Sequence, residues 1–109
     1  MITGKPAYVP LGTTANKQGR VAGANAAGGN DRFKGIVGTA VVKVFDVEAA
    51  RTGLSERQAQ AEGFEVETAA VTSSAQAHYM PGHTPIHVKL VFERGSQRLL
   101  GAQMAGGVA

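Results

Sequence analysis

Alternation of apolar and polar residues near the end of the chain points to a β-sheet. Residues 86–93 carry a large apolar side chain at every second position, with polar side chains between them: Ile86, Val88, Leu90 and Phe92 against His87, Lys89 and Glu93. Because successive side chains of a strand point to opposite faces, this pattern predicts a strand whose apolar set faces inward. Turn-forming residues 94–97 then lead into residues 98–104, which predicts an antiparallel hairpin.

Two further segments have the character of strands. Residues 38–46 are rich in β-branched side chains and predict one strand. Residues 64–72 alternate, with Glu65 and Glu67 on one face and a less polar set on the other: Phe64, Val66, Thr68 and Ala70. The chain is therefore expected to form four strands.

A short helix is expected between the first two strands. Ser55 and Gln58 match a capping box, in which each side chain bonds the backbone N–H of the other residue. The helix should run over residues 56–62 and end at Gly63, with Leu54 available as a hydrophobic staple. The predicted fold class is α+β: a mostly antiparallel four-stranded sheet with one short helix between strands, preceded by a separate N-terminal helix.

The N-terminal 34 residues differ in character from the rest. Proline at positions 6 and 10 predicts an extended entry, and Thr13 or Thr14 is expected to cap a helix that ends at Gly28-Gly29. Small residues recur on one face of this helix: Ala15, Gly19, Ala22, Gly23 and Ala26. Such a face allows close approach of another backbone or a flat ligand. We expect residues 1–34 to be poorly packed within this chain or to make non-native contacts.

Composition excludes several classes of protein. The 109 residues contain no cysteine, which removes disulfide scaffolds, cysteine-ligated metals and thiol redox centres. No apolar run approaches the roughly 18 residues that a membrane span needs, so no membrane partner is expected. Nothing at the N-terminus resembles a signal peptide, which favours a cytoplasmic location.

Charge and histidine content suggest no specific site. The formal charge is +3, but the basic residues form scattered pairs, so no nucleic-acid partner is expected: Lys17 with Arg20, Arg32 with Lys34, and Arg94 with Arg98. His78, His83 and His87 straddle a Pro-Gly turn without an accompanying carboxylate, so no metal site is predicted. A free-standing small basic module that binds nucleic acid or protein is the alternative function.

Tyr79 is the one candidate catalytic residue. It lies in a loop between two strands, where its ring can cover the sheet edge or its hydroxyl can act as a donor or acid. The sheet module is also small and ends after a strand without a covering helix, so we expect a partner surface: another copy or a missing piece of chain.

The order of several motifs resembles one family. Residues 10–25 resemble the late segment of the flavin domain in the pyridine nucleotide-disulfide oxidoreductases. Four later segments resemble the C-terminal dimerisation domain of these enzymes in the coenzyme A-disulfide reductase, NADH oxidase and NADH peroxidase branch: residues 38–46, 52–56, 78–82 and 100–103.

The resemblance implies a fragment of a larger enzyme. Residues 1–34 would be the remnant of the FAD-binding domain, and residues 35–109 a dimerisation domain truncated at its C-terminus. The parent would be a homodimeric NAD(P)H:disulfide (coenzyme A disulfide) reductase or NADH oxidase that uses FAD and NAD(P)H. The fragment, lacking the redox cysteine and both dinucleotide fingerprints, would bind neither cofactor and be inactive alone.

The resemblance also implies roles for four residues. Leu11, Gly12 and Thr13 match the start of a helix whose N-terminus faces the flavin pyrimidine ring, which suits the positive end of a helix dipole. Tyr79 matches the first residue of a frequent Tyr-Tyr pair that reaches the thiol–disulfide centre of the other subunit, and Met80 replaces the second.

Overall fold

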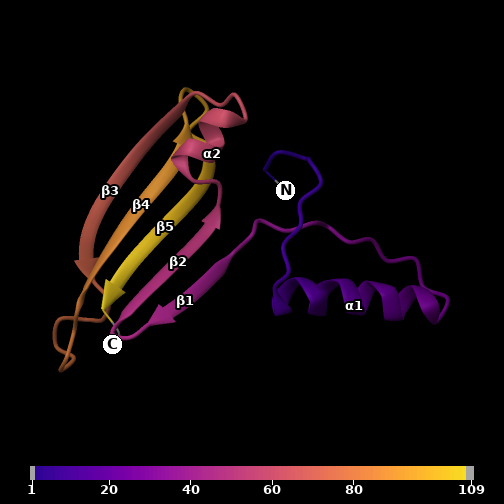
Figure 1. The fold of residues 1–109 in the computed structure, drawn as a ribbon, viewed down its shortest axis with the longest axis horizontal. Helices are drawn as coiled ribbons and strands as arrows, with labels where there is room; N and C mark the ends of the chain where they lie inside the picture. The colour runs from indigo at the N-terminus through magenta and orange to yellow at the C-terminus, as the bar shows by residue number, and fades with distance from the viewer. Residues whose placement is uncertain (1, 108–109) are drawn as a thin grey trace.

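A five-stranded antiparallel sheet with one helix on it and one helix apart forms the fold (Figure 1). The computed structural model describes residues 2–107. Met1 of the expected segment 1–34 and residues 108–109 of the expected domain 35–109 lie outside the described residues. The strand order is β1-β2-β5-β4-β3. The elements are α1 (Gly12–Ala26), β1 (Ala40–Val44), β2 (Val47–Gly53), α2 (Glu56–Ala61), β3 (Val66–Ser74), β4 (Pro85–Glu93) and β5 (Leu99–Gly107).

The predicted antiparallel α+β sheet is confirmed, but the expected number of four strands is wrong. Residues 38–46 do not form one strand, because β1 ends at Val44 and β2 starts at Val47 after a two-residue turn. Phe45 occupies this turn with a φ of 53°, a left-handed conformation that bulky residues rarely adopt. Neither Gly nor Asn marks the turn, so the chain gives no local signal that the strand reverses there.

Helix α2 follows the local prediction closely. Ser55 accepts a bond from the Gln58 N–H, and the Gln58 side chain accepts one from the Ser55 N–H, which completes the capping box. The helix packs on one end of the sheet, where its Ala59 meets Val91 and Leu100 in a core with no exposed surface. Four half-buried side chains surround this core: Ile2, Leu54, Phe64 and Val66.

The face of the sheet that α2 covers is not the face that was predicted to be buried. Lys89 on β4 bonds Glu56 of α2, and Val91 lies in the core, so the face that carries these two residues is the helix face. Leu90 points to the opposite, open face and is 37% exposed. The register pairs Leu90 with Ala69 and Lys89 with Ala70, so the apolar sets expected on β3 and β4 lie on opposite faces. The prediction that the Leu90 set forms the core is therefore wrong.

Helix α1 projects away from the sheet, joined to it by extended segments on either side (Figure 1). The radius of gyration is 17.3 Å, against about 13 Å for a compact domain of this length. Thr14 is the one buried residue of α1. The predicted threonine cap is wrong, because the N-cap is Leu11 and no side chain caps the helix. The predicted end is confirmed: Gly28 has a φ of 90°, and the Gly29 N–H bonds the Ala24 carbonyl.

Candidate functional site

The first turn of α1 presents backbone donors without partners. The Leu11 carbonyl accepts from the N–H groups of Thr14 and Ala15, both at 3.0 Å, whereas the N–H groups of Gly12 and Thr13 have no acceptor among residues 2–107. No acidic side chain occupies this turn. Free N–H groups at the positive end of a helix favour an electron-rich oxygen or an anion. An added Cβ at Gly12 would meet nothing within 4 Å, so this end of the helix is open to an approaching group.

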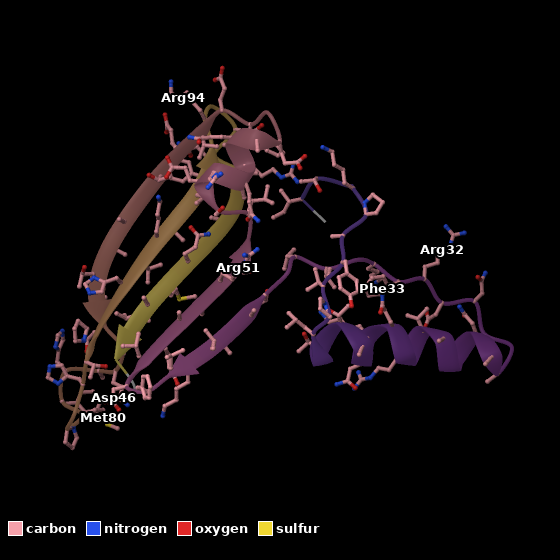
Figure 2. All side chains as sticks on the ribbon, viewed as in Figure 1. Arg32, Phe33, Asp46, Arg51, Met80 and Arg94 are labelled. Atoms are coloured by element: carbon pink, nitrogen blue, oxygen red, sulfur yellow. The ribbon has the colours of Figure 1, made fainter. Side chains whose placement is uncertain are left out.

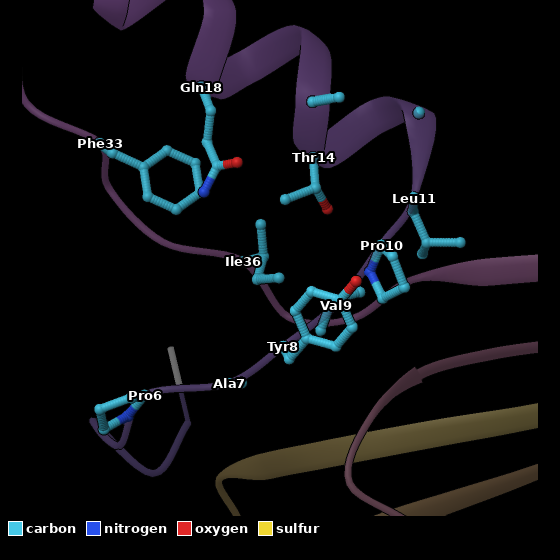
Figure 3. A pocket seen from close by; sticks show the side chains of 12 residues that line it. Pro6, Ala7, Tyr8, Val9, Pro10, Leu11, Thr14, Gln18, Phe33 and Ile36 are labelled. Atoms are coloured by element: carbon cyan, nitrogen blue, oxygen red, sulfur yellow. The ribbon is translucent and has the colours of Figure 1, made fainter.

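A hollow of about 640 Å³ lies beside this turn, between the extended entry, α1 and the segment that returns to the sheet (Figure 3). Figure 3 shows Thr14 and Gln18 pointing into it from the helix, with Phe33 and Ile36 facing them from the return segment. The lining therefore combines apolar side chains with a few polar groups, as small-molecule sites do.

Tyr79 lies at the tip of the loop between β3 and β4 and is 87% exposed. A turn closed by the Met80 N–H and the Ala77 carbonyl, 2.8 Å apart, holds it there. The rings of His78 and His83 meet edge to face, with centroids 5.4 Å apart. Nothing among the described residues covers the Tyr79 hydroxyl or makes a hydrogen bond with it, so the ring extends from the sheet rather than covering its edge.

The structure does not bring Tyr79 and the start of α1 together. The loop that carries Met80 lies at one end of the molecule and α1 at the other, along a longest dimension of 52 Å (Figure 2). One copy of the chain therefore cannot place both candidates at one reaction centre.

The three histidines form no common site. His87 Nδ1 lies 2.8 Å from the Thr72 hydroxyl on the helix face, whereas His78 and His83 contact each other. Within residues 2–107, no group of three or more His, Cys, Asp or Glu side chains is arranged to hold a metal ion. Over the same residues, no helix has the length and apolar character needed to cross a membrane.

An apolar row crosses the open face of the sheet. Paired positions on all five strands place these side chains next to one another: Val41, Ala50, Met104, Val88 and Val71. Val41 and Val71 at its ends are 72% and 56% exposed. Exposed apolar surface of this continuity is typical of an interaction surface.

Two of the basic pairs line a common hollow, although the sequence predicted that the pairs would lie far from one another. Lys17 and Arg20 of α1, with Arg32 and Lys34 of the return segment, border a space of about 520 Å³. The expectation of separate pairs is wrong here because the chain reverses at Gly28-Gly29 and runs back along the helix. Two charged pairs on either side of a glycine turn were the signal available in the sequence.

These features define an antiparallel sheet module with an open apolar face of the kind that interaction domains present. The chain belongs to the family described as pyridine nucleotide-disulphide oxidoreductase, dimerisation domain, which matches residues 39–109. The expected family is thereby confirmed.

Individual relatives narrow the branch. The chain is 46% identical over 97% of its length to the NAD(P)H coenzyme A polysulfide/persulfide reductase of Pyrococcus horikoshii, and 31% identical over 93% of its length to the coenzyme A disulfide reductase of Staphylococcus epidermidis. It covers 24% and 23% of those proteins, so it spans about a quarter of the length of the curated relatives it matches.

Solved structures agree with this assignment. The NAD-dependent persulfide reductase of A. fulgidus superposes on the whole chain with a TM-score of 0.94 and 43% identity, over 20% of its own length. The reduced CoADR-RHD of Bacillus anthracis superposes on 96% of the chain with a TM-score of 0.88 and 37% identity, over 19% of its length.

Proposed function

We propose that the chain supplies the dimer interface and one wall of the flavin site in a homodimeric, FAD-dependent NAD(P)H reductase of persulfides or coenzyme A disulfide. The observation that carries this proposal is the A. fulgidus superposition, which spans the complete chain. The superposition includes α1, which lies apart from the sheet. Within residues 2–107, no packing against the sheet holds α1 in this position, so its agreement with the larger enzyme supports the proposal. Residues 1–34 then belong to the FAD domain and residues 35–109 to the dimerisation domain.

The start of α1 fits one edge of a flavin. Its two unpaired N–H groups, at Gly12 and Thr13, can donate to a ring carbonyl, and Leu11 supplies an apolar contact beside them. The positive end of the helix stabilises negative charge on the ring. FAD supplies the electron transfer when bound, whereas this chain contributes the donors that orient one edge of it. No glycine fingerprint for the dinucleotide phosphates occurs in the sequence, so this chain holds only that edge.

Tyr79 is proposed to act in the site of the partner subunit. Its exposed hydroxyl extends from a loop that is remote from α1 of its own chain. A two-fold dimer built on the open apolar row can place such a loop against the second subunit. There the hydroxyl can donate a hydrogen bond or a proton to sulfur.

A chimera tests the proposal. The matching fifth of the A. fulgidus persulfide reductase is replaced by this chain, and flavin content, mass in solution and NADH oxidation with a disulfide or persulfide are measured. We expect a flavin-loaded, active dimer. A chimera that folds, as judged by circular dichroism, but remains monomeric or free of flavin would refute the proposal.

Tyrosine 79 is tested within the same chimera. Tyr79→Phe removes only the hydroxyl, so turnover should fall by about tenfold or more while thermal stability is unchanged, as for loss of a general acid or donor. Thr68→Val, which removes an exposed hydroxyl on β3, is the matched control. Equal turnover in Tyr79→Phe and Thr68→Val would remove Tyr79 from the mechanism.

A further inference from the structure

The basic hollow between α1 and the return segment concentrates the positive charge of the chain. Four of the 11 Lys and Arg residues line it, Lys17, Arg20, Arg32 and Lys34, against one of the 8 acids, Asp31. The ion pairs of residues 2–107 use other basic side chains, at Lys5, Lys89 and Arg94. Within residues 2–107, none of these four cations is paired with a carboxylate, so each is free to bind an added anion.

The segment that carries half of this charge is held in place. The Asn25 side chain on α1 accepts from the Asp31 N–H at 2.7 Å and donates to the Asp31 carbonyl at 3.0 Å. These two bonds fix the return segment beside the helix directly before Arg32. Because they use the backbone of Asp31, its carboxylate remains a separate charge in the hollow. Preorganisation of this kind lowers the entropy lost when a ligand binds.

We propose that this hollow binds a small phosphate-bearing ligand of the nucleoside diphosphate class. Its volume of about 520 Å³ lies within the range of about 300–1,000 Å³ that is usual for small-molecule sites. Arg20 and Arg32 can bind phosphate oxygens with two N–H groups each, and Lys17 and Lys34 add point charges. Val21 and Phe33 supply apolar surface for a base. Figure 2 shows Arg32 next to Phe33 on the return segment, and both residues line the hollow.

Nucleic acid fits this surface less well. A single-stranded nucleic acid needs a charged groove that follows several phosphates, usually with several aromatic platforms. The cations here surround one hollow with one aromatic ring, Phe33, and the remaining basic residues lie on other elements. The proposal concerns a surface of α1 away from its N-terminus and does not depend on the proposed reductase function.

Calorimetric titration of the full chain tests it with ADP, inorganic pyrophosphate, adenosine and a short single-stranded DNA. We expect one site per chain for ADP and for pyrophosphate, weaker binding at higher salt, and none for adenosine. Arg32→Gln should weaken ADP binding by about tenfold, as loss of a hydrogen bond to a charged group does. Arg57→Gln on α2 removes the same charge from a distant exposed position and should change affinity less than about twofold.

Two variants distinguish a built site from general charge attraction. Asp31→Asn removes the opposing carboxylate and should tighten ADP binding by about threefold, a gain that misfolding cannot imitate. Asn25→Ala leaves every charge in place but releases the return segment, so it should weaken binding.

The proposal fails if Arg57→Gln weakens ADP binding as much as Arg32→Gln, or if Asp31→Asn has no effect. DNA that binds more tightly than ADP with the same response to these variants would show a nucleic-acid surface and refute the small-ligand assignment. ADP should bind more tightly than pyrophosphate, because Val21 and Phe33 contact its base. Binding of pyrophosphate as tight as that of ADP would refute the assignment to a nucleoside diphosphate.

Discussion

Substitution of Gly101 by alanine should disrupt the contact between α2 and the sheet. Gly101 is buried on β5 and pairs with Gly53 of β2. A Cβ built on Gly101 would lie 2.7 Å from the backbone nitrogen of Leu54 and 2.9 Å from its carbonyl carbon, and closer still to its oxygen. All three are backbone atoms, so no change of side-chain rotamer relieves the overlap.

The loss in free energy of unfolding can be estimated from the backbone of Leu54, which must move to make room for the added Cβ. Leu54 precedes the Ser55 cap, its N–H bonds the Leu100 carbonyl at 2.9 Å, and its carbonyl accepts from Gln103 at 3.2 Å. Overpacking of this kind costs about 1–3 kcal/mol, and loss of one backbone hydrogen bond adds about 1 kcal/mol. We therefore expect Gly101→Ala to lower the free energy of unfolding by about 2–4 kcal/mol. That is a large fraction of the roughly 5–15 kcal/mol typical of a domain.

Urea denaturation of the full chain, followed by circular dichroism, measures this loss. Gly19→Ala is the matched control, because a Cβ there meets nothing within 4 Å. It should leave the unfolding of the sheet unchanged and raise the helix content of α1, since alanine favours a helix over glycine by about 1 kcal/mol. A Gly101→Ala chain with the wild-type urea midpoint would show that α2 does not need this close approach.

Three further outcomes can be measured on the same chain. Leu100→Ala should destabilise the chain by about 3 kcal/mol in urea denaturation, because Leu100 is fully buried beside Ala59 and Val91; a loss below about 1 kcal/mol would mean that this core contributes little. Ser55→Ala should cost about 1 kcal/mol through loss of the capping bond, with Ser73→Ala, at an exposed position on β3, as its control. Amide exchange should be fast throughout α1 and slow in β5, so equal protection of the two would contradict the separate packing of α1.

Local signals were sufficient for α2. The capping box at Ser55 and Gln58 and the stop at Gly63 involve residues only a few positions apart, so the sequence contains all the information they need. The end of α1 was predictable for the same reason, because Gly28 adopts a positive φ that other residues resist. Its start was not, since Leu11 acts as N-cap without a side-chain bond while Thr13 and Thr14 lie inside the helix.

Which face of the sheet is buried could not be predicted from the sequence, because it depends on tertiary packing. Alternation shows that Leu90 and Val91 point to opposite faces, but it does not show which face a helix covers. Both faces of β4 carry apolar side chains, and the larger set lies on the open face. Val91 is the buried residue because α2 packs on the face of the sheet to which Val91 points. Similarly, the reversal at Phe45 depends on a strained conformation that nothing nearby in the sequence announces.

The candidate site was predictable only as separate pieces, and the structure explains why. An isolated helix of 15 residues is marginal in water, and α1 buries only Thr14 against its own chain. Under the proposed function, α1 gains its stability from surfaces of a larger protein, and the Tyr79 loop at the opposite end meets its partner there as well. A residue whose chemical partner lies on another domain or subunit leaves no periodicity or spacing signal in its own sequence. The roles proposed for Gly12, Thr13 and Tyr79 therefore rest on motif order and on exposure: within residues 2–107 the N–H groups of Gly12 and Thr13 have no acceptor, and the Tyr79 hydroxyl is uncovered.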